Sequence, residues 1–363
     1  MYMFWSSNII SFSPSISTSV FAAELTLLAK ALRPLPEKFH GLKDPELRHR
    51  RRYVDLIVNP EVRETFIKRA QIITAIRDYL NRHQFLEVET PTLQAIYGGA
   101  NAKPFTTHFN ALHLDMYLRV SNELYLKRLI VGGFDRVYEF VKNFRNEGVD
   151  STHNPEFSAM EFYCAYIDYN EIMKMTEEIW AEAVQKVCGS TKITYQNHKI
   201  DLTPPWTRLS MTEAIKKYAD IAVEKLSDKE LFALQKKYHI PFAGKLTRGI
   251  MTQLLFEHLV EDKLIQPVFI IDHPEETTPL CKSHRRKKGL VERLEPYIAG
   301  MEVGNGYSEL NDPLLQRKLL EQQVERGRGG EEETHPMDED FIEALEYGLP
   351  PTGGMGFGID RMV

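Results

Sequence analysis

Two acidic residues beside a tight turn are the first candidates for chemistry. Gly300 suits the last position of a turn centred on Ile298-Ala299, and pairing about that centre places Glu295 opposite Glu302. Facing carboxylates repel each other by up to about 1 kcal/mol, and a divalent cation turns that repulsion into binding. Mg²⁺ prefers one or two carboxylates together with phosphate oxygens. The pattern therefore predicts a Mg²⁺–nucleotide site, with two solvated surface acids as the alternative.

The segment that follows carries polar side chains at every second position. Asn305, Tyr307 and Glu309 alternate and would share one face of a strand. Gly304 and Gly306 lie between them and leave room for a ligand against the backbone, or for a bulge. This face is a candidate wall of a binding pocket.

A second acid lies on a predicted strand pair. Period-2 alternation over residues 156–166 places Phe157, Glu161 and Tyr163 on one face. Burying an unpaired Glu costs several kcal/mol, so Glu161 needs a cation or a ligand. Arg145, on the neighbouring predicted strand over 136–147, is a candidate cation, and a purely structural Arg145–Glu161 pair is the alternative.

A third acid, Glu123, lies in the first turn of a helix predicted from Ser121 to Val131. The helix dipole alone would stabilise a carboxylate there, which is the simpler interpretation. Together with Glu161 and Glu309, however, Glu123 completes a set of acids able to surround one amine. A carboxylate-rich pocket with aromatic walls suits a long cationic substrate and would repel an acidic one.

The C-terminal segment Gly353–Arg361 is rich in glycine and enters a helix. Such a segment is a common platform for phosphate or adenine. It is neither G-x-G-x-x-G nor a P-loop, because no G-K-[ST] follows. Asp360-Arg361 sharpens the prediction, since Arg supplies a fixed cation for a phosphate.

The elements that must position these residues can be read from periodicity and capping. Asn59-Pro60 begins an amphipathic helix that runs to Arg82. Capping boxes at Asp168/Glu171, Ser210/Glu213 and Ser227/Glu230 begin three more helices, the last two within a helical insertion over about 206–288. Strands clustered with long helices, without regular βαβ alternation, favour an α+β fold with an antiparallel β-sheet flanked by helices.

Composition narrows the class of protein. The 363 residues include 45 Lys and Arg against 51 Asp and Glu, a formal net charge of −6, which argues against holding nucleic acid by bulk charge. Three cysteines without C-x-x-C favour a reducing compartment, hence a cytoplasmic location. No apolar run is long enough for a membrane span. Residues 1–23 are interpreted as a disordered or non-native leader without a basic n-region.

Three segments taken together resemble the motifs of class II aminoacyl-tRNA synthetases. Helix 61–82 with the strand ending Glu89-Thr90-Pro91 resembles motif 1, the dimer interface of that family. The segments that resemble motif 2 are 144–147, 153–157 and 160–163. The segment 354–361 resembles motif 3. The resemblance is finest to the lysyl-tRNA synthetases and covers nearly all of residues 24–363. The segments 97–100, 122–128 and 302–311 fit them closely.

The resemblance implies roles for individual residues. Those implied to hold lysine are Gly99, Glu123, Arg145, Glu161, Tyr163, Asn305, Tyr307 and Glu309. Those implied to hold ATP are Arg145, Glu147, His153, Asn154, Phe157, Glu295, Glu302, Gly358 and Arg361. Glu295 and Glu302 would bind Mg²⁺, and Arg145 and Arg361 would be catalytic.

The implied activity is ATP-dependent formation of lysyl-adenylate and transfer of lysine to the 3′ end of tRNA(Lys), by a homodimer. The family carries an N-terminal anticodon-binding OB domain, of which only a remnant and linker are expected at 24–56, before a catalytic domain at 57–363. We also expect the motif 3 helix and the final strand of the family to be missing after Val363. We therefore expect an Arg361 without rigid support and weak or absent aminoacylation.

Two rivals stay open at this stage. The first is a related ligase that lysylates translation elongation factor P, which the synthetase-like linker 33–56 argues against. The second is an inactive synthetase-like module with a binding or regulatory role. An aspartate or asparagine enzyme is disfavoured because Glu123 and Glu309 have the wrong sign for an acidic side chain.

Overall fold

The computed structural model describes residues 24, 26–36, 42–150, 153–242, 244–328 and 335–363. The proposed leader, residues 1–23, lies outside them. The chain divides into two compact units, Met1–Ile67 and Lys68–Val363. The boundary falls inside one long helix, α3 (Pro60–Arg82), whose predicted start at Asn59-Pro60 is confirmed.

The first unit is organised around a buried acid. It contains α1 (Pro45–Arg50), α2 (Arg52–Val58) and the first turns of α3. Asp55 is fully buried, yet Arg48 Nε donates to it at 2.8 Å and Asn59 Nδ2 at 2.7 Å. The described residues before α1 form neither helix nor strand. An OB-domain remnant at 24–56 stays a prediction.

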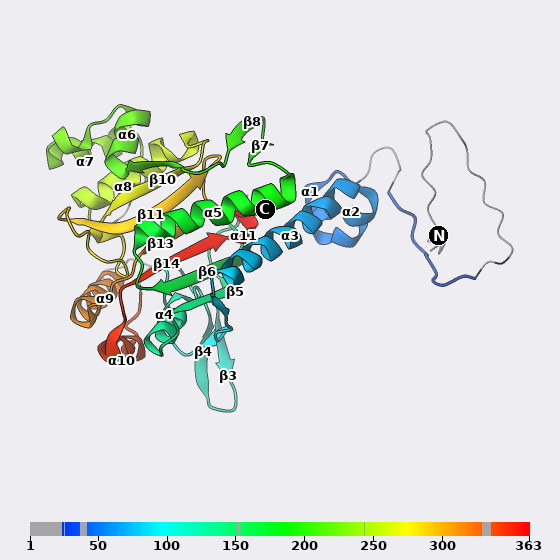
Figure 1. Ribbon diagram of the computed structural model, residues 1–363, viewed down its shortest axis with the longest axis horizontal. Coiled ribbons are helices and arrows are strands. Elements are labelled where there is room, and N and C mark those ends of the chain that lie inside the picture. The colour runs from blue at the N-terminus through cyan, green and yellow to red at the C-terminus, as the bar shows by residue number, and fades with distance from the viewer. Residues whose placement is uncertain (1–23, 25, 37–41, 151–152, 243, 329–334) are drawn as a thin grey trace. The chain divides into compact units, whose positions relative to one another are not determined.

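The second unit is built on a nine-stranded mixed sheet (Figure 1). Its strand order is β1 (Leu86–Glu87), β5 (Arg136–Phe144), β6 (Glu156–Ala165), β14 (Thr352–Gly358), β13 (Gly304–Ser308), β11 (Leu290–Ile298), β10 (Val268–Pro274) and β9 (Thr207–Ser210). A short strand, β12 (Met301–Glu302), pairs with β11. The pairs β1–β5 and β9–β10 are parallel and the others antiparallel, which confirms the predicted α+β fold.

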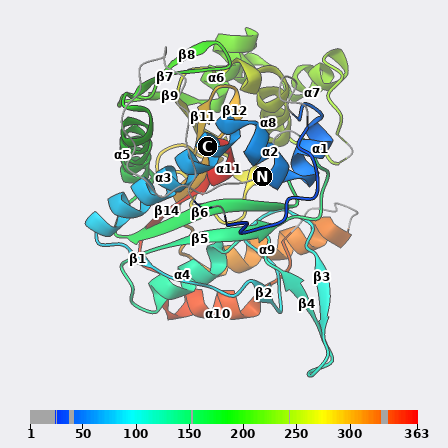
Figure 2. The same ribbon diagram turned by 90° about the vertical axis from the view of Figure 1, so that its right-hand side faces the viewer.

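Alternation along the central strands divides the apolar residues between two faces. On β6, Met160, Phe162 and Cys164 join the cluster under α5 (Tyr169–Cys188), with residues 72–80 of α3. Tyr163 and Ala165 point the other way and join the cluster under α4 (Glu123–Val131) and α10 (Glu339–Gly348). Figure 2 shows α4 and α5 on opposite sides of β5 and β6. The face under α4 is the one that carries Tyr163 and Tyr307.

The remaining elements complete the second unit. A third core holds α6 (Met211–Ala219), α7 (Asp228–Lys237) and α8 (Arg248–Leu259) against β10. All three predicted capping boxes are present, at Asp168, Ser210 and Ser227. The other elements are β2 (Leu93–Gln94), β3 (Thr106–Phe109), β4 (Leu114–Leu118), β7 (Lys192–Tyr195), β8 (His198–Asp201), α9 (Pro313–Arg328), α11 (Ile359–Met362) and the 3₁₀ turns η1 (Val223–Lys225), η2 (Glu261–Lys263) and η3 (Glu275–Thr277).

The hairpin between β11 and β12 corrects the predicted register. The turn is centred on Ala299-Gly300, which have φ of 55° and 75°, and Tyr297, not Glu295, pairs with Glu302. Positive φ at both central residues is the geometry that matches the twist of the flanking strands, and alanine gives little signal for it. Because Glu295 is two residues from Tyr297, both acids still share one face, on a diagonal.

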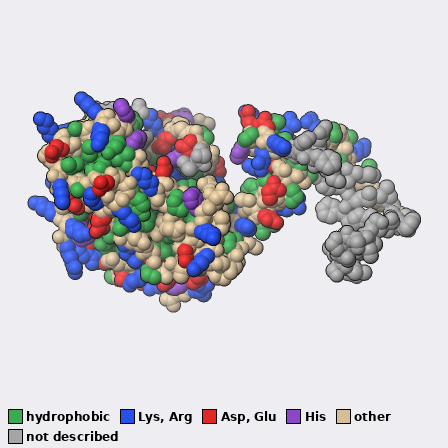
Figure 3. Space-filling model, turned by 90° about the horizontal axis from the view of Figure 1, so that it is seen from above, with side chains coloured by type: hydrophobic (Ala, Val, Ile, Leu, Met, Phe, Trp, Pro, Cys, Tyr) green, Lys and Arg blue, Asp and Glu red, His purple; other side chains and the backbone are tan. Residues whose placement is uncertain are grey.

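Charges of both signs are interspersed on the face drawn in Figure 3, as the near-balanced composition predicts. No helix within the described ranges is long and apolar enough to cross a membrane.

The core between sheet and helices predicts a large cost for Phe269→Ala. Phe269 on β10 is fully buried and stacks on Trp206 with ring centroids 5.3 Å apart. We expect the substitution to lower the free energy of unfolding by about 3–5 kcal/mol in urea denaturation. Phe134→Ala, at a residue 45% exposed, should change it by about 0.5 kcal/mol or less. Equal losses for the two variants would contradict this account of the core.

Candidate active site

Residues on the face of the sheet that carries Tyr163 and Tyr307 form two rows across three adjacent strands. Tyr163 on β6, Gly354 on β14 and Tyr307 on β13 pair in one row. Glu161, Gly356 and Asn305 pair in the next row. The middle strand thus contributes glycine to both rows, while its neighbours contribute large side chains. The result is a floor of bare backbone between polar walls.

Gly354 is required by the closeness of those walls. A Cβ there would lie 2.2 Å from Glu309 Oε1 and 2.4 Å from Tyr163 Cε1. At the rim, Gly99 has φ of 86°, and its Cβ position is 2.8 Å from Ser121 Oγ. Because both residues lack a Cβ, the backbone at these two positions can lie directly against the acidic side chains.

A buried lysine joins two of the three predicted acids. Lys127 Nζ lies 2.5 Å from Glu123 Oε1 and 2.5 Å from Glu309 Oε2. Tyr307 donates its hydroxyl hydrogen to Glu123 Oε2 at 2.8 Å. Burial lowers the pKa of Lys127, but the two carboxylates more than offset it, so that its pKa is raised and the ammonium form is kept. Burial raises the pKa of Glu309 to about 8 even though Lys127 lowers it.

Glu161 is satisfied by hydroxyl groups, which corrects the expected ion pair. Ser121 Oγ and Tyr163 Oη donate to its two oxygens at 3.3 and 3.0 Å. Burial and the charge of Glu123 raise the pKa of Glu161 to about 8. Within the described part of the chain, Arg145 makes no ion pair with Glu161. The register explains why, since Glu139 on β5 faces Glu161, and β5 ends before Arg145.

Arg145 instead lies at the far end of the strand pair, over an aromatic ring. Its guanidinium carbon is 5.0 Å from the ring centroid of Phe157, and its backbone N–H donates to Pro155 O at 2.9 Å. Its Nε is buried without a hydrogen-bond partner among the described residues. A buried N–H of a cation that lacks a partner is suited to an anionic ligand.

The other predicted nucleotide residues are nearby or exposed. Glu147, His153 and Asn154 are exposed. Arg361 on α11 donates from Nη1 to the backbone oxygen of Glu302 at 2.6 Å, and its Nη2 is 3.3 Å from His153 Nε2. Our expectation that Arg361 lacks rigid support is therefore wrong. The contacts to Glu302 fix the guanidinium next to the predicted metal acids.

The two predicted metal acids differ in their surroundings. Arg293 Nη2 and Tyr297 Oη donate to Glu295 at 2.6 and 3.0 Å. Burial raises the pKa of Glu295, but Arg293 and His273 lower it by more, so that it lies below its usual range. Burial and the charge of Glu295 raise the pKa of Glu302. This mutual repulsion is the feature a divalent cation relieves, so the pair fits Mg²⁺ carried by a nucleotide. No larger set of three or more metal-ligating side chains occurs among the described residues.

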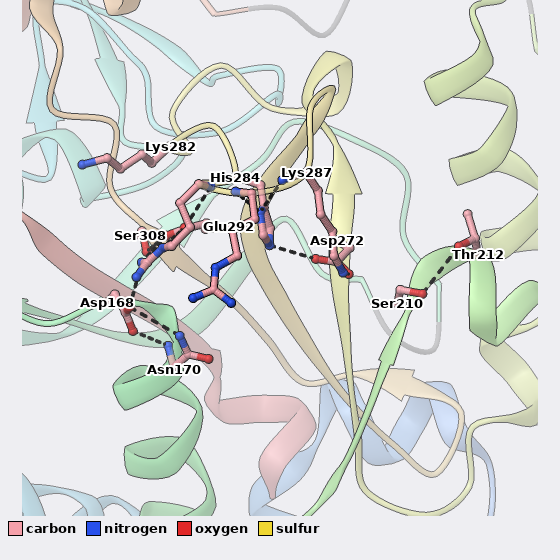
Figure 4. A network of polar contacts seen from close by, with 12 residues as sticks. Asp168, Asn170, Ser210, Thr212, Asp272, Lys282, His284, Lys287, Glu292 and Ser308 are labelled. Atoms are coloured by element: carbon pink, nitrogen blue, oxygen red, sulfur yellow. Dashed lines mark hydrogen bonds and ion pairs between the residues drawn. The ribbon is translucent and has the colours of Figure 1, made fainter. Parts of the chain in front are cut away.

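A polar network on the opposite face holds β13 in place (Figure 4). Ser308, between Tyr307 and Glu309, donates to Glu292 Oε2 at 2.6 Å and accepts from the backbone N–H of Tyr169 at 3.2 Å. Arg285 ion-pairs with Glu292 and, at 2.7 Å, with Asp168, the N-cap of α5. These contacts anchor the residue whose neighbours point into the pocket.

Sequence reasoning missed two cations of the site, of which Lys127 is buried and Arg293 half-buried. Lys127 follows Glu123 by four residues on one helix, a spacing that signals only a surface pair until the burial of α4 is known. Arg293 joins the two subsites, since its Nε donates to Asn305 Oδ1 at 3.0 Å while its Nη2 holds Glu295. Alternation on β11 places Arg293 and Glu295 on one face and was an available signal.

The short distances from the Cβ position of Gly354 to neighbouring side chains predict that Gly354→Ala lowers the stability of the protein. The added methyl group overlaps Glu309 and Tyr163, so we expect the free energy of unfolding to fall by roughly 1–3 kcal/mol. Gly148→Ala is the control, because no atom of the described residues lies within 4 Å of its Cβ position. A Gly354→Ala protein as stable as Gly148→Ala in urea would contradict the observed packing.

Burial of Glu309 predicts a pH-dependent effect of Glu309→Gln. With a folded pKa of about 8 against an ordinary 4.5, the folded chain holds more protons than the unfolded chain between these values. The stability contributed by this group is therefore lost as pH rises through that range. We expect the free energy of unfolding of the unaltered protein, minus that of Glu309→Gln, to fall between about pH 5 and pH 8.5. The exposed Glu343→Gln should show a constant difference; constancy for Glu309→Gln as well would contradict the shift.

Comparison with known proteins shows which family the chain belongs to. Residues 44–363 match the family model of the class II tRNA synthetases (D, K and N). The Lysine–tRNA ligase of Clostridium perfringens (strain ATCC 13124) is 54% identical over 349 residues, which are 95% of this chain and 70% of that protein. The Lysine–tRNA ligase of Clostridium botulinum (strain Loch Maree) is 53% identical over 350 residues, 95% of this chain and 69% of that protein. Its motifs, its sheet and these similarities together show that the chain belongs to the class II tRNA synthetases of the D, K and N group.

Proposed function

We propose that this protein activates L-lysine with ATP to lysyl-adenylate and transfers the lysyl group to the 3′ end of tRNA(Lys). The observation that carries the proposal is the convergence of Glu123, Glu161 and Glu309 on one glycine-floored pocket. Three carboxylates against one buried ammonium, Lys127, leave a formal charge of −2 when all are ionised. Free lysine brings two ammonium groups, which match that charge.

The same pocket discriminates among the amino acids of the D, K and N group. An aspartate side chain would meet three acids of its own sign, which costs several kcal/mol in a desolvated site. An asparagine amide would leave at least one buried carboxylate without a cation. Lysine alone of the three satisfies the acids, and the named relatives, Lysine–tRNA ligases, favour the same choice.

The chemistry requires positioning and charge neutralisation rather than a protein nucleophile. The carboxylate oxygen of lysine attacks the α-phosphorus of ATP, the bond from that phosphorus to the bridging oxygen breaks, and pyrophosphate leaves. A hydroxyl of the terminal ribose of the tRNA then takes the lysyl group, its proton is lost, and AMP leaves. In this proposal Arg145 binds the α-phosphate and Arg361 the far phosphate, so both act on charge that develops during the transfer.

Further residues serve the nucleotide in this proposal. Phe157, beneath the Arg145 guanidinium, stacks on adenine, and those that hold the rest of ATP are Glu147, His153, Asn154 and Gly358. Glu295 and Glu302 would hold Mg²⁺, which supplies charge neutralisation for the phosphates. Asn305, hydrogen-bonded to Arg293, joins the lysine and metal subsites.

We also propose that α3, the motif 1 helix, pairs with a second copy of the chain. Its exposed Phe66 and Ile67 are 47% and 52% accessible, an apolar surface that a partner helix would cover. The two rival functions are less favoured: relatives above 50% identity are named for tRNA ligation rather than for modification of an elongation factor, and the intact charge pattern of the pocket is unnecessary in an inactive module.

The test is amino-acid-dependent exchange of pyrophosphate into ATP by the purified chain. We expect exchange with lysine and none above background with aspartate or asparagine. Glu161→Gln should raise KM for lysine about 10–100-fold and leave KM for ATP unchanged, because it removes one charged hydrogen-bond acceptor. The exposed Glu343→Gln should behave like the unaltered protein. Exchange that prefers aspartate or asparagine, or is absent with all three, would overturn the proposal.

A further inference from the structure

The most unusual charge in the second unit is the ammonium of Lys127. Its side chain is fully buried, on the second turn of α4, and its Nζ lies between Glu123 and Glu309 at 2.5 Å from each. The ammonium is also 5.6 Å from the ring centroid of Tyr307. All three partners belong to the set assigned above to lysine, so Lys127 touches the pocket from behind rather than from solvent.

A structural role alone accounts poorly for this arrangement. A buried ion pair is on average no more stabilising than well-packed apolar residues of similar volume, so an apolar side chain at this position would serve the packing of α4. What an apolar side chain cannot do is orient two neighbouring carboxylates and favour their charged forms over the protonated ones. Without a cation, buried acids this close take up protons instead.

We propose that Lys127 is a positioning residue for lysine specificity: its ammonium holds Glu123 and Glu309 in place and favours the charged form of Glu309, so that their remaining lone pairs can bind an ammonium group of the amino-acid substrate. This inference rests on the proposed function of the pocket. The inference adds to that function a residue, Lys127, that does not touch the reacting atoms. Lys127 instead influences the charge of the carboxylates that touch the substrate.

Other groups around Lys127 do not take over this task. Burial lowers the pKa of His335 to about 4, so its ring is neutral at physiological pH. Burial also raises the pKa values of the Cys281 thiol and of the Tyr163 and Tyr307 hydroxyls, so all three stay protonated and uncharged. Of the groups that face the two carboxylates here, Lys127 therefore supplies the positive charge.

Lys127→Met tests the proposal through KM for lysine measured against pH. Without the ammonium, Glu309 binds a proton more tightly, and each unit by which its pKa rises removes about tenfold of its ionised form at neutral pH. We expect KM for lysine in pyrophosphate exchange to rise about tenfold or more at pH 7. The ratio of the variant's KM to that of the unaltered protein should fall as pH rises above 8, as Glu309 of the variant ionises, while KM for ATP stays unchanged.

The control is Arg128→Met, on the next residue of the same helix. Arg128 ion-pairs with Asp338 at 2.7 Å, so this variant also loses an ion pair of α4 while the pocket acids keep theirs. It should leave KM for lysine unchanged at each pH. If Lys127→Met fails to fold, Lys127→Met/Glu309→Gln removes two of the three buried charges together, and its KM for lysine should be raised at every pH without recovery.

Each outcome decides between alternatives. A lower KM for lysine in Lys127→Met would mean that Lys127 competes with the substrate for its carboxylates, and would overturn the proposal. So would equal changes in KM for lysine and ATP, a pH-independent rise in Lys127→Met, or a recovery of the double variant at high pH. If the unaltered protein shows no lysine-dependent exchange, the proposed function itself fails, a result distinct from an effect confined to the variants.

Discussion

The desolvation of three carboxylates is the constraint around which the second unit is organised. Glu123 and Glu309 are buried and Glu161 is half-buried, and each needs a cation, a hydroxyl or a ligand to stay in place. The fold provides Lys127 for two of them and the hydroxyls of Ser121 and Tyr163 for the third. With these partners in place, the carboxylate oxygens can still accept hydrogen bonds from further donors. A pocket of this kind is stable when empty and gains most from a ligand that carries ammonium groups.

The sheet makes this arrangement possible because its middle strand has no side chains on the pocket face. Gly354 and Gly356 separate Tyr163 and Glu161 from Tyr307 and Asn305, so walls from strands two apart in the sheet face each other across backbone. The opposite face secures the geometry through Ser308, which is held by Glu292 and by the backbone at the start of α5. One strand, β13, thus carries residues of the glycine-floored face and an anchoring residue in alternation.

Local signals in the sequence predicted local structure well. The capping boxes at Asp168, Ser210 and Ser227 begin α5, α6 and α7 as expected, because a cap depends on residues three apart. The Ala299-Gly300 turn was misplaced by one residue, since alanine does not signal positive φ. The Arg145–Glu161 pair failed because strand length and register, which place Glu139 opposite Glu161, are tertiary properties. Residue types suggested that the three acids could surround one amine, and the family resemblance strengthened that expectation. Lys127 was missed because its burial depends on how α4 packs.

Proton release on lysine binding tests the central claim most directly. With pKa values of about 8, Glu161 and Glu309 are mostly protonated in the empty pocket at pH 7, and an incoming ammonium favours their charged forms. Calorimetric titration of lysine at pH 7 in buffers of different ionisation enthalpy should show release of more than one proton per lysine bound. Release should become small above about pH 9. Lysine binding with no net proton release at pH 7 would contradict a pocket built from buried, ammonium-binding carboxylates.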